Sequence, residues 1–450
     1  MSFDLVFRGG RVVSSSGTRR ADVYVSDGRI AAVTAEVFPA AREVDAGGLL
    51  VFAGMIDTHV HFMDPGDASR EDFPTGTSAA ACAGVTTVVE HTHARPVRTV
   101  DELRAKVAHL ESRSVVDYGL AAHAWPDRLD EAEPLWRAGV TYIKAFTCTT
   151  HGVPGFDAAH LLELFKRAAP TGVRCLVHCE DESITGYWEE SLRAAGRRDP
   201  AIVCEWRNRD AEATATVVTS FLARLTRAPI VVAHASNPEI LRLVERERAE
   251  GAQILVESCP QYFLLREDEL LDLGPFRKFT PPARARTERD LEHMWDALAD
   301  RRIHHISSDH APSTAEQKTG GEIWDVHFGL PGIDTTLAVL LDAAHVGWIS
   351  YERVAEAYSE GPARAYGLWP RKGSLQEGAD ADVVLVDPSR VWRVADSDVI
   401  SRAGWSPFAG RTLVGGAVAT YVRGQLVAED RKLVAQPGTG RFVAGAGSGR

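Results

Sequence analysis

The stretch Met55-Ile-Asp-Thr-His59-Val-His61-Phe62 decides the fold class, and an apolar run, Leu49-Leu-Val-Phe52, precedes it. Together they predict a buried strand that carries two histidines at its C-terminal end. Side chains two residues apart on a strand point to the same face, so His59 and His61 can present two imidazoles to one ion. Divalent metals held by imidazole nitrogens at about 2.0–2.1 Å need such converging donors. The pair alone does not establish a metal site, because most His-x-His pairs are ordinary polar residues.

The following part of the chain repeats one unit: an apolar strand, a loop and a helix. Eight strand candidates lie at 53–60, 85–90, 117–124, 140–147, 173–180, 229–236, 252–259 and 303–309. Helical patterns separate most of them, for example at Ala158–Ala169, Ala211–Leu225, Glu239–Glu250 and Glu288–Asp300. Eight such units over about 250 residues predict an α/β fold of the (β/α)8 TIM-barrel type, whose active site lies at the C-terminal ends of the strands.

Both ends of the chain carry short strands. Asp4–Arg8 and Ala381–Asp387 are examples in which apolar and polar residues alternate, and glycine-containing turns separate such runs. We expect the N-terminal strands to form a small antiparallel sheet and to join the C-terminal strands in one β-sandwich. The predicted domains are 1–51 (first part of the sandwich), 52–374 (barrel) and 375–450 (second part of the sandwich, with a flexible tail from Ala444).

Composition narrows the classes of function. The 450 residues carry a net charge of −12 and are 45% hydrophobic, which provides a sizeable interior but no basic face for nucleic acid. No apolar run reaches the roughly 18–20 residues of a membrane span, and the N-terminus lacks the pattern of a signal peptide. The six cysteines are scattered without a secreted-type framework. We therefore expect a cytoplasmic protein that binds neither nucleic acid nor membranes.

Five of the predicted barrel strands end in side chains that bind metals. These residues are His59 and His61 on the first strand, Lys144 on the fourth, His178 on the fifth, His234 on the sixth and Asp309 on the eighth. Each of them has an ordinary explanation, since a lone histidine at a strand end is more often structural and a lysine usually extends its charge to water. Because strand ends converge at one mouth of a barrel, the whole set predicts a metal site there.

This ligand set resembles that of the amidohydrolase superfamily, and more narrowly that of the cyclic amidohydrolases: hydantoinases, dihydropyrimidinases and allantoinases. The resemblance extends over nearly the whole chain. It includes Cys259-Pro-Gln-Tyr, Pro281-Pro-Ala-Arg, Ser308-Asp-His, Pro331-Gly-Ile-Asp and Gly378-Ala-Asp-Ala-Asp. The ligand set as a whole is specific to the family, whereas the glycine and proline motifs alone are not.

The resemblance implies a cofactor and a mechanism. Carbon dioxide would convert Lys144 into a carbamate that bridges two divalent ions, either zinc or, as alternatives, manganese or cobalt. His59, His61 and Asp309 would hold one ion, and His178 and His234 the other. A hydroxide that bridges the metals would attack the ring amide, and Asp309 would be the catalytic acid–base residue. Relatives of this kind are commonly homotetramers.

Five positions bear on the small-molecule cyclic amide that the resemblance implies as substrate. D-type hydantoinases and dihydropyrimidinases carry a tyrosine five residues after the lysine, where this chain has Thr149. Thr280 and the backbone of Phe328 and Gly329 match family positions that hydrogen-bond the cyclic amide, although simple loop geometry explains them equally well. Dihydroorotases carry an arginine two residues after the second histidine, where this chain has Met63, which argues against a dihydroorotase.

Two alternatives remain open at this point. The absence of the tyrosine also fits an allantoinase or an L-type hydantoinase, and a non-catalytic relative of dihydropyrimidinase could share the fold. Such scaffolds have lost metal ligands, whereas this chain keeps all six. A second His-x-His pair, His91 and His93, is expected to line the pocket or to bind backbone, since the ligand set is already complete. His151 and His327 lie in predicted loops near the mouth, where they would contact either substrate or solvent.

Overall fold

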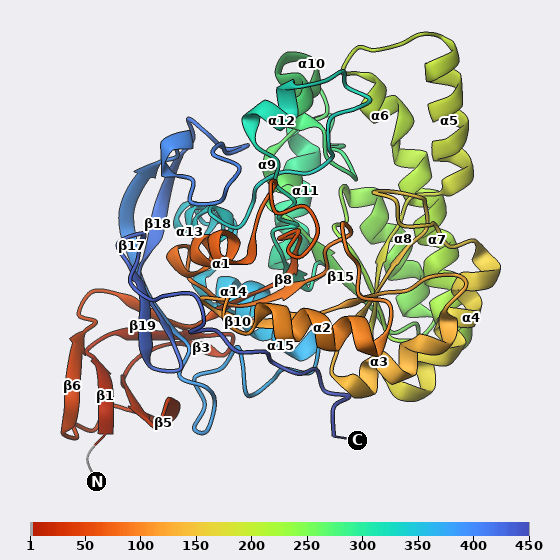
Figure 1. The fold of residues 1–450 in the computed structure, drawn as a ribbon. Helices are drawn as coiled ribbons and strands as arrows, with labels where there is room; N and C mark the ends of the chain where they lie inside the picture. Colours follow the sequence, from red (N-terminus) through yellow and green to blue (C-terminus); the bar gives the residue numbers. More distant parts are fainter. Residues whose placement is uncertain (1–2, 450) are drawn as a thin grey trace.

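A closed ring of parallel strands forms the centre of this computed structural model, which describes residues 3–449 (Figure 1). The ring strands are β8 (Met55–Val60), β9 (Val85–Glu90), β10 (Asp117–Leu120), β11 (Ala122–His123), β12 (Ile143–Phe146), β13 (Cys175–His178), β14 (Ile230–Val232), β15 (Ile254–Ser258) and β16 (His305–Ile306). The β10 and β11 segments together form the third barrel strand. The ring closes where the backbone N–H of His61 donates to the His310 carbonyl at 2.7 Å. The predicted fold class, a (β/α)8 barrel, is therefore confirmed.

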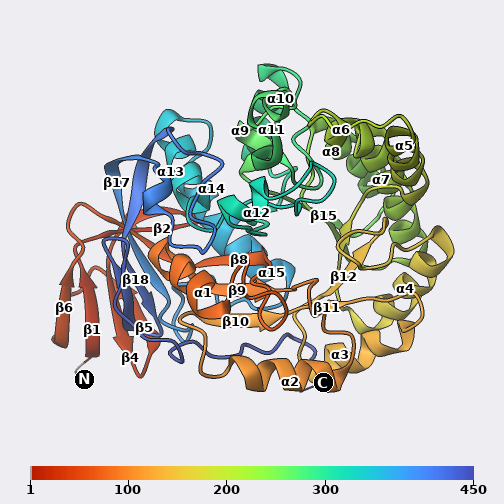
Figure 2. The same ribbon diagram turned by 45° about the horizontal axis from the view of Figure 1, so that its top comes forward.

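Helices surround the ring, as the view in Figure 2 shows. The main ones are α1 (Phe73–Cys82), α2 (Val100–Leu110), α3 (Ala132–Ala138), α4 (Ala158–Thr171), α7 (Arg209–Thr226), α8 (Pro238–Ala249), α11 (Glu288–Ala299) and α13 (Thr336–Val346). Further helices are α5 (Glu182–Ala194), α6 (Ile202–Trp206), α9 (Gln261–Leu264), α10 (Glu269–Leu273), α12 (Ala315–Thr319), α14 (Tyr351–Ala355) and α15 (Gly361–Ala365). Side chains at their starts set the boundaries, since Asp157 caps α4, Asn208 caps α7 and Thr287 caps α11.

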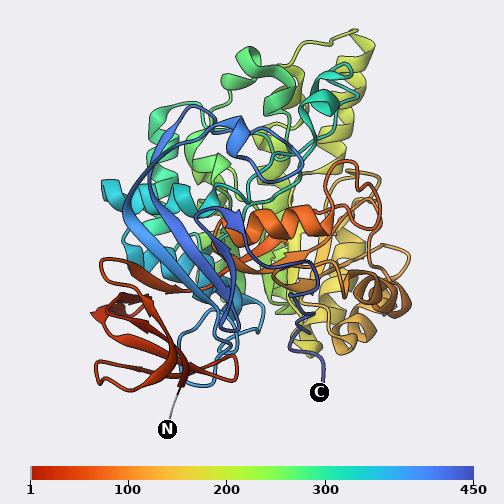
Figure 3. The ribbon, with the colours of Figure 1, turned by 60° about the vertical axis from the view of Figure 1, so that its left-hand side comes forward.

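The two chain ends build a second domain of two sheets beside the barrel, and Figure 3 shows the red N-terminal and blue C-terminal strands together. Its strands are β1 (Phe3–Arg8), β2 (Arg11–Ser14), β3 (Gly17–Arg20), β4 (Asp22–Ser26), β5 (Arg29–Thr34), β6 (Ala40–Asp45), β7 (Leu50–Ala53), β17 (Val383–Arg393), β18 (Thr412–Val422), β19 (Gln425–Glu429) and β20 (Lys432–Leu433). The expectation of a purely antiparallel N-terminal sheet was wrong. β1 pairs with β6 in parallel, and β2 with β7, because longer connections return the chain in the same direction.

The last residues also differ from expectation. The tail from Ala444 was predicted to be flexible, yet Gly445 donates its N–H to the Gly139 carbonyl at 2.9 Å, and Val443 donates to Tyr118 at 2.7 Å. A Cβ atom at Gly447 would overlap Trp136. The small residues, which predict flexibility from sequence, therefore let the tail pack closely on the barrel as far as Gly447.

Side chains that point into the ring form its interior. One inner layer consists of Val89, Ala121, Tyr142, Leu176, Val231 and Ala233. Because side chains alternate along a strand, the next inward positions towards the mouth are His91, His123, Lys144 and His178. The same alternation that builds the apolar core therefore places a layer of polar side chains directly above it. Among residues 3–449, no helix has the length and apolar character needed to cross a bilayer.

Candidate metal centre and substrate pocket

The structure brings all six predicted ligands together at the mouth of the barrel. His59, His61, Lys144, His178, His234 and Asp309 line one pocket. His59 and His178 lie at or near the ends of β8 and β13, and Lys144 is the second residue of β12. His61, His234 and Asp309 follow β8, β14 and β16. Their convergence agrees with the sequence prediction, and their role as metal ligands stays a prediction.

His59, His61 and Asp309 form what we call the first donor group. The Nε2 atoms of His59 and His61 lie 3.2 and 3.3 Å from the same carboxylate oxygen, Asp309 Oδ1. The two histidines point to the same side because they are two residues apart on β8. Two neutral nitrogens and one anionic oxygen thus converge on one point, which is a donor set that suits several divalent metals.

His178 and His234 form the second donor group, with His178 Nδ1 3.0 Å from His234 Nε2. Lys144 lines the same pocket, and its Nζ lies 3.5 Å from His59 Nε2. Burial lowers the pKa of the Lys144 ammonium to about 8. A larger fraction of this side chain is therefore the neutral amine near neutral pH than for an exposed lysine.

A buried carboxylate orients one histidine of each donor group. Glu257 Oε1 lies 2.6 Å from His59 Nδ1, and Glu180 Oε2 lies 2.8 Å from His178 Nε2. Each carboxylate can accept the proton of one ring nitrogen, which leaves the lone pair of the other nitrogen facing the pocket. Outer partners of this kind fix the tautomer and ring orientation of histidines that bind metals.

Two of the six residues have an unusual backbone conformation. His234 and Asp309 adopt left-handed φ values of 35° and 49°. Val231 and Ala233 belong to the inner layer, so simple alternation would turn His234 away from the barrel axis. The left-handed conformation at the strand end instead directs His234 into the pocket. Strained residues of this type concentrate at functional sites.

Three of the four predicted substrate-binding residues also line the pocket: Thr280, Phe328 and Gly329. The Thr280 hydroxyl donates to Glu180 Oε2 at 2.7 Å, and the Gly329 N–H donates to the Lys278 carbonyl at 3.1 Å. Gly329 has a φ of 119°, and a Cβ atom there would overlap the Ala311 carbonyl oxygen. Only glycine therefore fits at this position of the wall.

The structure places the fourth, Thr149, outside the pocket, which corrects the sequence analysis. Thr149 is exposed, its N–H donates to the Glu182 carboxylate, and its hydroxyl accepts from Gly155 N–H at 3.3 Å. His151 adopts a left-handed φ of 53°, and the loop turns so that His151 lines the pocket instead. Sequence spacing alone could not reveal this turn.

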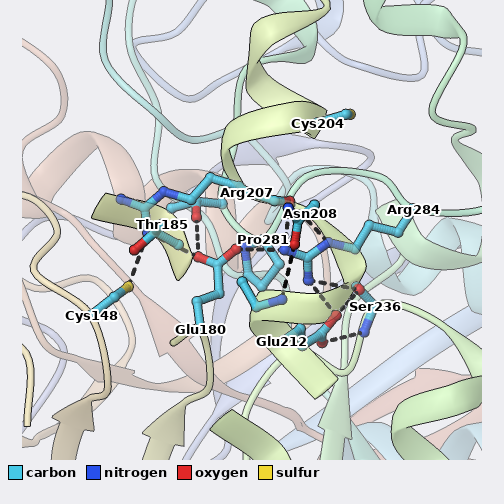
Figure 4. A network of polar contacts seen from close by, with 12 residues as sticks. Cys148, Glu180, Thr185, Cys204, Arg207, Asn208, Glu212, Ser236, Pro281 and Arg284 are labelled. Atoms are coloured by element: carbon cyan, nitrogen blue, oxygen red, sulfur yellow. Dashed lines mark hydrogen bonds and ion pairs between the residues drawn. The ribbon is translucent and has the colours of Figure 1, made fainter. Parts of the chain in front are cut away.

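Glu180 belongs to a buried network that the sequence analysis missed (Figure 4). Its carboxylate accepts from Arg284 Nη2 at 2.5 Å and from Arg207 Nη1 at 3.2 Å, and Arg284 also pairs with Glu212. Cys148, His178 and Glu180 form a cluster of metal-type side chains. We do not assign an ion to that cluster, because two guanidinium groups already compensate the charge of Glu180.

Further histidines surround the first donor group. The His91 ring lies 4.5 Å from that of His59 and 4.3 Å from that of His61, measured between centroids. The His93 ring stacks on His151 at 4.0 Å and 14°. His123 is buried beside His91, with ring centroids 5.5 Å apart. The structure therefore places His91 and His93 beside the first donor group, and neither lines the pocket around the six predicted ligands.

The remaining candidate, His327, is solvent-exposed, and its backbone carbonyl accepts from Lys318 Nζ at 2.9 Å. It does not line the pocket around the six predicted ligands.

The donor sets fit two divalent ions. In the first group, the two imidazole nitrogens lie 3.2 and 3.3 Å from one carboxylate oxygen of Asp309. In the second group, the two imidazole nitrogens lie 3.0 Å from each other. Tetrahedral ligands about 2.0–2.1 Å from a zinc ion would be about 3.3–3.4 Å apart, so the donors need to move little. Lys144 lines the same pocket as both groups, and its Nζ lies 3.5 Å from His59 Nε2.

Comparisons with known proteins agree with this site. The family model described as "Amidohydrolase family" matches residues 50–427. The chain is 33% identical to an L-hydantoinase from Paenarthrobacter aurescens and 36% identical to an allantoinase from Rubrobacter xylanophilus, with 98% of each chain covered in both comparisons.

A solved structure, "L-Hydantoinase (Dihydropyrimidinase) from Arthrobacter aurescens", superposes with a TM-score of 0.93 at 32% identity, covering 98% of this chain and 100% of that one. These matches confirm the predicted resemblance to the cyclic amidohydrolases. This chain therefore belongs to the amidohydrolase family.

Proposed function

We propose that this protein is a metal-dependent hydrolase that opens the ring amide bond of a hydantoin, a dihydropyrimidine or a related cyclic imide. The observation that carries the proposal is the convergence of six metal-type side chains from five strands on one pocket. The same pocket includes the backbone of Phe328 and Gly329 and the side chain of Thr280. Relatives named L-hydantoinase and allantoinase, matched over nearly their whole length, support this substrate class.

The proposed cofactors are two divalent ions, with zinc as the first choice and manganese or cobalt as alternatives. The first donor group would hold one ion, the second donor group the other, and Lys144, carboxylated by carbon dioxide, would lie between them. A lysine ammonium beside two cations would be repelled, whereas a carbamate is an anion. When bound, such ions polarise a carbonyl group and lower the pKa of water from about 15.7 towards 7.

The side chains of the pocket would then position substrate and move a proton. Asp309 would take the proton of the attacking water and deliver it to the ring nitrogen while the C–N bond breaks, which yields a carboxylic acid and a free amide or amine. Burial raises the pKa of Asp309, which favours such proton transfer. Proton transfer by a positioned side chain typically contributes about 10²–10⁴-fold to the rate.

An allantoinase is the second candidate. It is favoured by the 36% identical relative of that name and by the lack of a tyrosine at Thr149. A non-catalytic scaffold is disfavoured because all six ligand positions are filled by metal-type side chains.

One screen separates these possibilities. The zinc-loaded protein is incubated with hydantoin, 5-substituted hydantoins of both hands, dihydrouracil, allantoin, phthalimide and dihydroorotate, and mass spectrometry detects the addition of one water. Opening of a hydantoin or dihydropyrimidine supports the proposal, and the preferred hand assigns the type. Opening of allantoin alone selects the second candidate. A metal-replete protein that opens none of these rings contradicts the proposal.

Assembly and location are further proposals. The resemblance supports a homotetramer, which light scattering after size-exclusion chromatography would test. A cytoplasmic location, supported by the scattered cysteines, would be tested by fractionation of the producing cells.

A further inference from the structure

His91 is the unassigned histidine whose ring lies nearest to both histidines of the first donor group, 4.5 Å from His59 and 4.3 Å from His61 between centroids. It is 1% exposed, and neither ring nitrogen has a hydrogen-bond partner among residues 3–449. Buried polar groups in proteins are nearly always paired, so two unpaired nitrogens on one ring require an explanation. A metal ion, which binds the lone pair of a ring nitrogen, would provide that explanation.

The strand geometry directs this ring towards the barrel interior, beside the two histidines of the first donor group. On β9, Val89 belongs to the inner layer of the barrel, and Glu90 points outward, where it pairs with Lys106 of α2. Alternation then turns the His91 side chain inward. The backbone N–H of His91 donates to the carbonyl of Val60, the residue between His59 and His61, at 3.1 Å. His91 is thus held beside His59 and His61 by the register of β8 and β9.

The donor atoms themselves converge. One ring nitrogen from each of His59, His61 and His91 lies within 4.8 Å of the others, and all three rings are buried. Nitrogens on one ion at about 2.0–2.1 Å lie about 3–3.5 Å apart, depending on geometry, so a modest rotation of the rings suffices. Imidazole-rich sites suit zinc, copper, iron and nickel.

We propose that His91 is a further ligand of the ion held by the first donor group, so that three imidazoles and Asp309 surround it. This inference rests on the proposed function, since it assumes that the first donor group binds a metal. It gives the two ions unequal surroundings: one with three histidines and one with two.

Metal binding by two matched variants tests the proposal. His91→Phe keeps a ring in the same space but removes both nitrogens, and His93→Phe makes the same change at the other histidine of the pair, whose ring stacks on His151. Zinc content is measured by elemental mass spectrometry after equilibration with a series of chelator concentrations. We expect His91→Phe to lower the affinity for one of the two ions by more than about 100-fold, beyond the roughly 10–100-fold loss typical when an outer partner of a ligand is removed. The zinc affinity of His93→Phe should remain within about threefold of that of the parent protein.

A second measurement needs no variant, so it does not depend on His91→Phe folding. The protein is labelled with [¹⁵N]histidine and loaded with ¹¹³Cd, and the ¹¹³Cd–¹⁵N couplings identify each bound imidazole. The proposal requires couplings from His59, His61, His91, His178 and His234. Couplings from the other four without His91, or unchanged zinc affinity in His91→Phe, would overturn it. If the unaltered protein binds no metal at all, the proposed function fails together with this inference, and a normal two-ion protein without a His91 coupling defeats this inference alone.

Discussion

Replacing Glu180 by glutamine tests whether the buried network of Figure 4 supports the second donor group. One carboxylate oxygen, Oε2, accepts from His178, Arg207 and Thr280, and the other, Oε1, accepts from Arg284 Nη2 at 2.5 Å. An amide has one oxygen, and that oxygen would take the site with three donors. Its NH2 group would then face the Arg284 guanidinium, donor against donor.

Two magnitudes follow from this geometry. Glu180 and Arg284 are both at most 1% exposed, and breaking a buried ion pair by removing one partner destabilises a protein by about 3–5 kcal/mol. The variant keeps an acceptor for His178 but loses the negative charge between two guanidinium groups and the second donor group. We therefore expect affinity for one ion to fall by about 10–100-fold, which corresponds to about 1.4–2.8 kcal/mol.

Urea denaturation of the metal-free protein, followed by tryptophan fluorescence, measures the first effect, and chelator competition measures the second. Glu189→Gln is the control, since its pair with Arg193 at 2.9 Å is exposed and spaced i,i+4, and it should change stability by about 0.3–0.5 kcal/mol. The reasoning is refuted if Glu180→Gln lowers stability by less than about 0.5 kcal/mol and leaves metal affinity within about threefold.

Three further predictions concern the wall, the domain junction and the metals. Gly329→Ala should lower stability by about 1–3 kcal/mol and slow ring opening, because its φ of 119° and the neighbouring carbonyl exclude a Cβ atom; unfolding curves and initial rates measure both. Lys372→Met leaves Asp117, Asp380 and Asp382 buried without their shared cation, so urea denaturation should show a loss of about 3–5 kcal/mol. Burial alone would lower the pKa of Lys372, but these aspartates raise it overall. The contribution of Lys372 to the free energy of unfolding should therefore be constant below the unfolded lysine pKa of about 10.4, and it should fall as pH rises through the higher pKa of the folded protein. A chelator should remove the two proposed ions in two steps, the second donor group losing its ion first, with activity lost at the first step.

Most of the barrel and of the donor set could be predicted from sequence because both depend on short-range patterns. Each of the eight strand candidates contains observed strand residues, and His59 and His178 lie at or near the C-terminal ends of their strands, while Lys144 is the second residue of β12. A strand shows itself by local apolar residues, and the barrel rule then brings the strand ends together without any further information. Even His234, which alternation alone would turn outward, was found because it directly follows an apolar strand.

The parts that were missed depend on contacts between distant residues or on backbone turns. Glu180 and Arg284 are 104 positions apart, and nothing local in the sequence indicates their pairing. The misplacement of Thr149 came from a left-handed residue, His151, which is neither glycine nor asparagine and so gives no turn signal. His91 belongs to a His-x-His motif, but six other residues already complete the expected ligand set, so the sequence predicts only a minor role for it.

The order of metal loss follows from the different surroundings of the two buried carboxylates. Glu257, behind His59, receives a hydrogen bond from the Ser307 hydroxyl at 2.9 Å and faces the His305 ring at 3.4 Å. Burial alone would raise the pKa of Glu257, but His59 and His305 hold it well below its usual range, so it stays an anion behind the first donor group. Glu180, behind the second donor group, is also an anion, but two guanidinium groups compensate its charge and would repel a nearby cation. The ion of the first donor group therefore has the greater negative charge behind it, and it should be the last to leave. Simultaneous release of both ions would show that Lys144, which we propose lies between them, outweighs this difference in charge.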